Sequence, residues 1–265
     1  MTTAVPCTKY HGCGNDFLIV KEADVAGLDL QRLITESCDR HTGIGADGFI
    51  IVKENPLEMV YYNQDGSRAP MCGNGIRCFS AFCLDEGIVT EDEFAVETLA
   101  GTRIIRVLAP DMFEVCMGAP LYDPALCGTP FAVSHYKLGT HDISTFFMNT
   151  IHTVLYSENA FGNIERVGQE ICTSPLFSQQ TNVNFVQVID PGHIRVQTYE
   201  RGCGVTLACG TGVCASVVQA HADGLTGTDV DVELRQGRLH IRLENDQVYL
   251  SGPARRIMKG EYIYD

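Results

Sequence analysis

The sequence predicts an α+β fold built from two similar domains. Two observations support this prediction: a cysteine phrase that occurs twice, and a set of neighbours that repeats at nearly the same spacing. Cys72-Gly73-Asn74-Gly75 recurs 137 residues later as Cys209-Gly210-Thr211-Gly212. The same offset joins Tyr62 to Tyr199 and Gly87 to Gly224, and it drifts to 136 between Arg106 and Arg242 and to 134 between Gly118 and Gly252. Slow drift of this kind indicates two copies of one unit with small loop deletions, not a solenoid of many short repeats.

The repeat also locates the domain boundary. We expect it next to Gly118, which gives an N-terminal domain 1–117 that carries Cys72 and a C-terminal domain 118–265 that carries Cys209. Whether the last residues pack back on the first domain is left open. Clefts between domains are favoured ligand sites, so the two cysteines are expected to face a common cleft.

The first-half elements follow from local patterns. The apolar runs 17–20 and 48–52 predict short buried strands. Asp29 is a suitable N-cap for a helix that ends near Cys38. Apolar residues after Cys72 recur at helical spacing on more than one face, which predicts a central, buried helix that ends at Gly87.

The second half repeats these signals. The residues after Cys209 have the same all-round apolar character up to Gly224, which predicts a second central helix. The segments 102–107 and 237–243 alternate polar and apolar residues, as strands of a half-exposed sheet do. Both are followed by turn residues at the matching place.

Composition excludes several classes of protein. At 265 residues with 45% hydrophobic and 20% charged residues, the chain is of ordinary globular composition. A net charge of −14 argues against a nucleic-acid partner. No apolar run of membrane-spanning length and no signal-peptide pattern occur, so we expect no membrane partner and a cytoplasmic location. The twelve cysteines show no Cys-x-x-Cys spacing, so we expect reduced thiols and no metal site.

The two cysteine phrases indicate a catalytic role for these cysteines, in preference to a role in core packing. Backbone N–H groups and the positive end of the helix dipole stabilise an anion at a helix start, and the same environment lowers the pKa of a cysteine. One reactive thiol would suggest a nucleophile. Two matched thiols suggest a pair of proton-transfer groups, with Cys72 and Cys209 as the catalytic residues.

Six phrases in the chain together resemble the diaminopimelate epimerase family. They are KYHGCGNDF at 9–17, RHTGIGADG at 40–48, YNQDGS at 62–67, MCGNGIRC at 71–78, ERGCG at 200–204 and ACGTG at 208–212. The resemblance implies two pseudo-symmetric domains, each with a curved antiparallel sheet wrapped around a central helix. It also implies a cofactor-independent epimerase that interconverts LL- and meso-diaminopimelate for lysine and peptidoglycan synthesis, in a family whose members are often homodimers.

The resemblance assigns roles to further residues. His152 is expected to support Cys72, and Glu200 to support Cys209 and to bind the substrate ammonium group. The substrate-binding set it implies is Asn15, Asn63, Gly73, Asn74, Asn182, Glu200, Arg201, Gly210 and Thr211. Without the resemblance, Asn15, Asn63 and Asn182 are equally well explained as turn or cap residues, and His152 as a structural histidine. His11, Asp16 and Asp47 are expected to brace loops.

One position departs from the family pattern. Where members commonly read Gly-Asn-Pro-His, this chain reads Asn149-Thr150-Ile151-His152, so Thr150 replaces an asparagine that helps to hold the distal end of the substrate. A hydroxyl offers fewer hydrogen bonds than an amide. We therefore expect relaxed specificity, with slow racemisation of glutamate as an example, unless Asn149 supplies the missing amide.

Three other functions stay open at this point. A proline or hydroxyproline racemase typically has histidine where this chain has Asn74, and a phenazine-pathway isomerase of the same fold leaves both cysteines unexplained. A thiol redox sensor or a non-catalytic amino-acid-binding module is the alternative outside the enzyme class. Exchange of the substrate α-proton with solvent separates an epimerase from the latter two.

Overall fold

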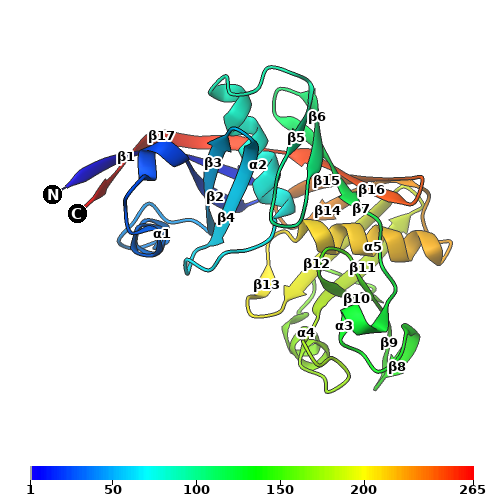
Figure 1. Ribbon diagram of the computed structural model, residues 1–265. Helices are drawn as coiled ribbons and strands as arrows, with labels where there is room; N and C mark the ends of the chain where they lie inside the picture. The colour runs from blue at the N-terminus through cyan, green and yellow to red at the C-terminus, as the bar shows by residue number, and fades with distance from the viewer. Residues whose placement is uncertain (1) are drawn as a thin grey trace. The chain divides into compact units, whose positions relative to one another are not determined.

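The protein is described here by a computed structural model covering residues 2–265, in which the chain divides into two compact units (Figure 1). Unit 1 comprises the residues up to Val115 together with Gly252–Asp265, and unit 2 comprises Cys116–Ser251. The chain thus leaves unit 1 two residues before the expected boundary and returns to it for its last strand. The mixture of helices and strands confirms the predicted α+β class.

Unit 1 contains two sets of hydrogen-bonded strands and the first of the long buried helices. Its elements are β1 (Thr3–Gly12), β2 (Asn15–Lys21), η1 (Glu22–Val25), α1 (Leu30–Cys38), β3 (Gly48–Glu54), β4 (Leu57–Asn63), α2 (Gly73–Asp85), β5 (Glu93–Val96), β6 (Arg103–Ala109), β7 (Met112–Gly118) and β17 (Arg255–Tyr264). The strands pair in the orders β17-β1-β2-β3-β4 and β5-β6-β7. The last three residues of β7 already belong to unit 2.

Unit 2 repeats this arrangement with its own helix. Its elements are α3 (Pro124–Cys127), β8 (Val133–Leu138), β9 (His141–Phe147), β10 (Ile151–Tyr156), α4 (Glu165–Cys172), β11 (Asn182–Asp190), β12 (His193–Glu200), β13 (Gly204–Thr206), α5 (Gly210–Ala222), β14 (Asp229–Leu234), β15 (Gly237–Glu244) and β16 (Gln247–Pro253). The strands pair in the order β16-β15-β14-β12-β11-β10-β9-β8, and β13 adds to β12.

Strand pairing reveals the duplication in detail. β2 runs parallel to β3 and β3 antiparallel to β4, just as β10 runs parallel to β11 and β11 antiparallel to β12. The outer neighbour of β1 is β17, and the outer neighbour of the corresponding β9 is β8. The C-terminal strand therefore fills in unit 1 the position that β8 fills in unit 2.

The sheets are mixed and not purely antiparallel, which corrects one detail of the expected architecture. The pairs β2–β3, β10–β11 and β12–β14 are parallel. In the first two pairs a helix, α1 or α4, lies between the strands in sequence, and a crossover of this kind is what brings consecutive strands into parallel alignment.

The two central helices match the prediction. α2 and α5 each span 13 residues, begin directly after a cysteine, and have nearly all side chains buried. The predicted stops follow each helix, since Gly87 and Gly224 adopt φ of 66° and 71° and donate to carbonyls of the last turn. Asp29 caps α1 as expected, accepting from the backbone N–H of Arg32 at 3.2 Å.

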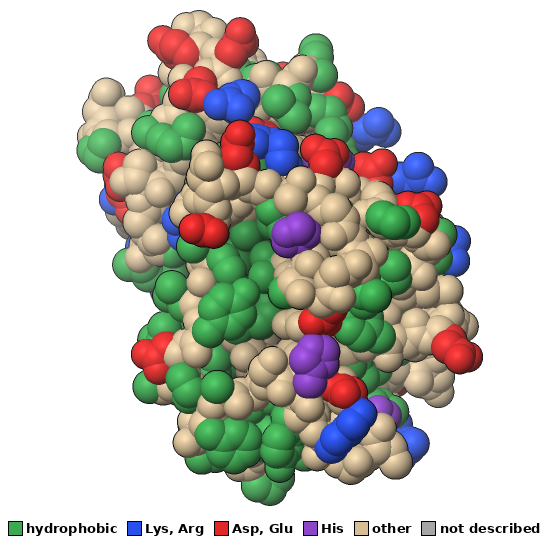
Figure 2. All heavy atoms as spheres, turned by 90° about the vertical axis from the view of Figure 1, so that its right-hand side faces the viewer, with side chains coloured by type: hydrophobic (Ala, Val, Ile, Leu, Met, Phe, Trp, Pro, Cys, Tyr) green, Lys and Arg blue, Asp and Glu red, His purple; other side chains and the backbone are tan. Residues whose placement is uncertain are grey.

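None of the helices between residues 2 and 265 is long and apolar enough to cross a membrane. Figure 2 shows one face of the molecule, on which hydrophobic side chains gather in patches between histidine and acidic side chains. Exposed large hydrophobic residues of unit 2 include Leu121, Tyr122, Leu126 and Phe131, which lie around the short helix α3.

Candidate active site

Cys72 is the N-cap residue of α2 in unit 1. Its backbone is extended (φ −133°, ψ 124°), and its Sγ accepts the backbone N–H of Gly75 at 3.4 Å. The first N–H groups of a helix have no intrahelical acceptor, so a thiolate at this position would be stabilised by backbone donors and by the helix dipole. The half-buried side chain also lies 3.7 Å from Oδ1 of Asn15, which can accept from the thiol.

Three polar side chains connect Cys72 to the interior of unit 1. Asn74 donates its amide to Oδ1 of Asn15 at 3.2 Å and accepts from the guanidinium of Arg77 at 2.9 Å. Arg77 is fully buried and also donates to the carbonyl oxygens of Gly73 and Pro253. The side chain of Asn74 is therefore engaged within the protein, and it holds Asn15 beside the cysteine.

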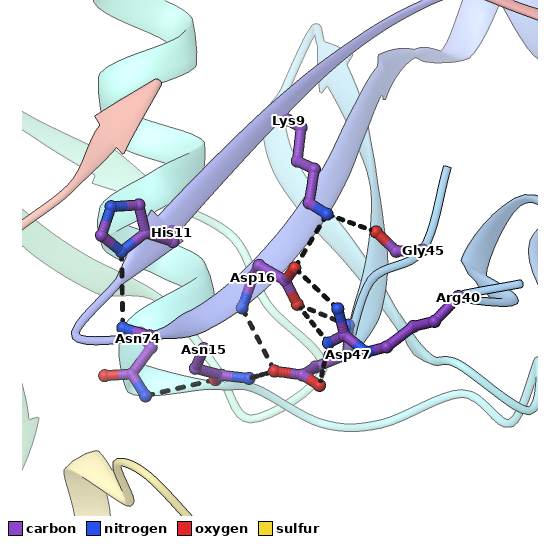
Figure 3. A network of polar contacts seen from close by, with 9 residues as sticks. Lys9, His11, Asn15, Asp16, Arg40, Gly45, Asp47 and Asn74 are labelled. Carbon is purple, nitrogen blue, oxygen red and sulfur yellow. Dashed lines mark hydrogen bonds and ion pairs between the residues drawn. The ribbon is translucent and has the colours of Figure 1, made fainter. Parts of the chain in front are cut away.

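An ionic network fixes Asn15 from the other side (Figure 3). Asn15 donates to Asp47 at 2.7 Å, and Arg40 joins the carboxylates of Asp47 and Asp16, each at 2.7 Å. Lys9 adds an ion pair to Asp16 at 2.9 Å. Burial alone would raise the pKa of Asp16, but the hydrogen bonds and charges of Arg40 and Lys9 outweigh it and lower that pKa to about 2.

These contacts agree with the expected bracing role of His11, Asp16 and Asp47. His11 Nδ1 accepts the backbone N–H of Gly14 at 3.4 Å, and the backbone N–H of Asp47 donates to the carboxylate of Asp16 at 3.0 Å. The loop before β3 is thus tied to the start of β2. The last residue of β4, Asn63, is held separately, because it donates to the Ser67 hydroxyl at 2.9 Å in the turn after that strand.

Cys209 is the N-cap residue of α5 in unit 2 and is buried. Its Sγ lies 3.5 Å from the hydroxyl of Thr211, the residue that corresponds to Asn74. Glu200, at the end of β12, accepts the Thr206 hydroxyl at 2.5 Å, which orients its carboxylate. Thr206 lies on β13, the short strand that leads toward Cys209.

Further predicted residues form a second group in unit 2. Asn182 accepts the backbone N–H of Arg201 at 3.0 Å. The guanidinium of Arg201 donates to the hydroxyl of Thr150 at 3.4 Å and to a backbone carbonyl at 3.0 Å. Asn149 has a positive φ of 60° and donates its amide to the carbonyl of Met117 at 2.8 Å, so its side chain has a structural contact.

His152 is fully buried at the start of β10. Its Nδ1 lies 3.1 Å from the amide nitrogen of Asn184, whose oxygen accepts the hydroxyl of Thr198 at 2.9 Å. Burial and the positive charge of Arg201 lower the pKa of His152 to about 3, so the ring is neutral at pH 7. Its Nε2 has no hydrogen-bond partner among the described residues.

Comparison with known proteins identifies the family. A model of the diaminopimelate epimerase family matches residues 7–122 and 149–257. The chain is 40% identical over 272 residues to the diaminopimelate epimerase of Alkaliphilus metalliredigens, covering 96% of each chain. The chain belongs to the diaminopimelate epimerase family. The relative from Clostridium perfringens is also 40% identical, over 271 residues, with 97% of this chain and 99% of that protein covered. Membership makes the chain an isomerase.

Solved structures share the epimerase fold at much lower identity. A phenazine biosynthesis protein from Bacillus anthracis superposes with a TM-score of 0.69 at 15% identity, covering 98% of this chain and 99% of that one. A hydroxyproline epimerase from Agrobacterium vitis gives 0.67 at 13% identity, covering 99% and 93%. At these identities the likeness shows the fold alone.

Reasoning from the epimerase motifs missed two buried polar residues that the structure brings to the cysteine helices. Arg77 was detectable, because a cation in a helix that is predicted to be buried requires internal partners. Asn184 was detectable from strand periodicity, because it lies two residues after Asn182 and therefore on the same face of β11.

Proposed function

We propose that the protein interconverts LL- and meso-diaminopimelate by acid–base catalysis with Cys72 and Cys209, without a cofactor. The observation that carries the proposal is the matched position of the two thiols, each the N-cap of a buried 13-residue helix at the same place in a duplicated unit. The names of the relatives support diaminopimelate as the substrate.

The reaction requires two groups of this kind. Inversion removes the α-proton from one face of the carbon and returns a proton to the other face, so a thiolate and a thiol exchange roles with the direction of the reaction. As the proton leaves, negative charge develops on the substrate carboxylate. Backbone N–H groups in the first turns, at Gly73 and Asn74 and at Gly210 and Thr211, would bind that charge most strongly in the transition state.

The surrounding side chains are proposed to bind and orient the amino acid. Glu200 would accept the substrate ammonium group and support Cys209, and Arg201 would bind a carboxylate with its planar fork. His152 would support Cys72. Asn15, Asn63 and Asn182 would complete the contacts to polar groups of the substrate, with Asn15 supported by the 2.7 Å bond that it already makes to Asp47.

Exchange of the α-proton tests the proposal. With LL-diaminopimelate in heavy water under reducing conditions, the wild type should incorporate deuterium at the α-carbon and produce the meso isomer. Cys72→Ala and Cys209→Ala should each abolish epimerisation with little loss of stability, since a methyl group replaces a small side chain. Cys78→Ala is a matched control, because Cys78 is a buried cysteine of α2 that lies away from the N-cap. Epimerisation retained in either N-cap variant would refute the two-thiol mechanism.

We further propose relaxed recognition of the distal end of the substrate. Thr150 offers one hydroxyl, which accepts from Arg201 at 3.4 Å, and the amide of Asn149 is engaged with a backbone carbonyl at 2.8 Å. Thr150→Asn should raise the ratio of kcat/KM for diaminopimelate to that for glutamate. Absence of any glutamate turnover in the wild type would rule this out.

A homodimer in the cytoplasm is proposed as the working form, without nucleic-acid or membrane partners. The exposed apolar side chains Leu121, Tyr122, Leu126 and Phe131 support self-association, because exposed apolar patches often mark interfaces. The net charge of −14 supports the absence of a nucleic-acid partner. Analytical ultracentrifugation at micromolar concentration that finds only monomer would reject the dimer, and cell fractionation tests the location.

A further inference from the structure

Asn184 lies at the centre of a buried polar trio in unit 2. Its amide nitrogen is 3.1 Å from His152 Nδ1 and 3.1 Å from the backbone carbonyl oxygen of Thr153, and its amide oxygen accepts the hydroxyl of Thr198 at 2.9 Å. All three side chains of the trio are at most 3% exposed. They come from β10, β11 and β12, so the trio spans three neighbouring strands.

The carbonyl of Thr153 determines which way the amide points. A backbone carbonyl can only accept, so the atom of Asn184 that faces it at 3.1 Å must be the nitrogen. In the opposite orientation two oxygens would face each other with no proton between them. The nitrogen carries two hydrogens, one directed to the Thr153 carbonyl and the other to His152.

This orientation also determines where the proton of His152 resides. Because Asn184 donates to Nδ1, that nitrogen must present its lone pair, and a neutral imidazole then carries its single proton on Nε2. The ring is neutral at pH 7, since burial keeps its pKa near 3. Nε2 is the ring atom that lacks a partner among the described residues, and a buried donor without an acceptor is unfavourable.

The corresponding site in unit 1 shows that the fold does not require this polar trio. The paired registers make Phe17, Ile50 and Tyr61 the equivalents of His152, Asn184 and Thr198. There no histidine or amide is present: the rings of Phe17 and Tyr61 make an edge contact at 5.9 Å, and the Tyr61 hydroxyl donates to Oδ1 of Asn63 at 3.1 Å. The polar trio of unit 2 therefore requires an explanation other than packing.

We propose that Asn184 is a positioning residue that locks His152 as the neutral Nε2–H tautomer, so that His152 serves the reaction as a hydrogen-bond donor to an anion and not as a proton acceptor. The anion is either the thiolate of a catalytic cysteine or the carboxylate of the substrate. This inference rests on the proposed function for the identity of the anion, whereas the tautomer itself rests only on the contacts of Asn184.

Nuclear magnetic resonance of the full chain labelled with nitrogen-15 histidine reads the tautomer directly. His152 should show a protonated Nε2 and an unprotonated Nδ1 at neutral pH, with its signals assigned by their loss in His152→Gln. An unprotonated Nε2 or a doubly protonated ring in the wild type would overturn the inference. Because no substrate is present, this result is independent of whether the chain acts on diaminopimelate.

Variants of Asn184 provide a second test. Asn184→Asp places an acceptor opposite Nδ1 and should move the proton to that nitrogen, and Asn184→Ile, which copies the residue of unit 1, should leave both tautomers populated. In each, kcat should fall by about 10- to 100-fold, the value of one hydrogen bond to a charged group. Thr181→Val is the matched control, since it removes a buried 2.9 Å hydrogen bond to Thr153 without touching His152, and kcat should change less than about threefold.

Two measurements identify the anion. If His152 donates to a thiolate, Asn184→Asp should raise the pKa of Cys72, followed by the pH dependence of its alkylation. If it donates to the substrate carboxylate, that pKa should stay constant while KM for diaminopimelate rises. An unchanged tautomer, thiol pKa and kcat in a folded Asn184→Asp variant would refute the positioning role. A wild type with the expected tautomer but no α-proton exchange would refute the proposed function alone.

Discussion

A single methyl group at Gly212 should disturb unit 2 far more than the same change at Gly75 disturbs unit 1. The two glycines occupy equivalent positions, three residues after Cys209 and Cys72, in the first turn of α5 and α2. A Cβ at Gly212 would lie 2.3 Å from Oδ1 of Asn184 and 2.9 Å from Oγ1 of Thr198. A Cβ at Gly75 would meet its nearest neighbours at 3.2–3.4 Å.

The magnitudes follow from what must move. Asn184 is fixed by hydrogen bonds on both ends of its amide, so Gly212→Ala must break at least one of them or shift the helix, at a cost of about 1–3 kcal/mol. At Gly75 the neighbours need to move only a few tenths of an ångström. The gain in helix propensity from Gly to Ala, up to ~1 kcal/mol, is the same at both positions, and it offsets most of the smaller cost at Gly75.

Differential scanning calorimetry of the two variants measures this difference. At about 2–4 °C per kcal/mol, and with the propensity gain deducted at both positions, Gly212→Ala should lower Tm by up to about 12 °C, and Gly75→Ala should change it by less than about 4 °C. Because Asn184 orients His152, Gly212→Ala should also lower kcat at temperatures where it is folded. Equal shifts in Tm for both variants would refute the argument that the amide of Asn184 makes this contact rigid.

Two further predictions concern unit 1. The pKa of Asp16 is lowered in the folded state, so its ion pairs with Arg40 and Lys9 stabilise the fold above its unfolded pKa near 4 and are lost as pH falls toward 2. Asp16→Asn should therefore lower the free energy of unfolding by up to about 2 kcal/mol at pH 7, measured by denaturant unfolding. The difference in free energy of unfolding between variant and wild type should disappear between about pH 4 and 2. A difference that stays constant with pH would contradict this prediction. Tyr264→Ala should cost about 2–4 kcal/mol, because Tyr264 is only 8% exposed and packs in the core of unit 1. Ile263→Ala, at a residue that is 56% exposed, should cost under about 0.5 kcal/mol. Equal losses of stability would mean that β17 is not part of the core of unit 1.

Local sequence signals predicted the central elements of the fold because those elements depend on local physics. The apolar runs after the two cysteines became α2 and α5, and the positive φ of Gly87 and Gly224 ended them as expected. The parallel pairing of β2 with β3 was not predictable in the same way. The direction of pairing depends on how the chain returns to the sheet after α1. The apolar sequences of β2 and β3 are compatible with both parallel and antiparallel pairing.

The same reasoning separates the predictable from the unpredictable parts of the site. The N-cap positions of Cys72 and Cys209 follow from the Gly-polar-Gly phrases alone. The role of the Asn74 side chain does not, because its contact with Asn15 joins segments almost sixty residues apart in the chain. A residue type at a helix start indicates which backbone groups are available, but its side-chain partners come from the tertiary fold.

Because the two units share one fold, the positions at which their residues differ are more informative than those at which they agree. If both units served only to hold a helix, neither would need a buried histidine and amide at these positions, and Phe17, Ile50 and Tyr61 show that the fold accommodates other side chains there. Unit 2 has polar groups there instead, at the cost of desolvating an imidazole whose Nε2 gains no partner from residues 2–265. Unit 1 avoids this desolvation cost and unit 2 retains it, which is best explained by a ligand that supplies an acceptor for Nε2. The four substituents of an amino-acid α-carbon are all different, whereas the two proposed proton-transfer groups are both cysteines, so the two units are expected to agree at the cysteines and to differ in the residues that contact the substituents.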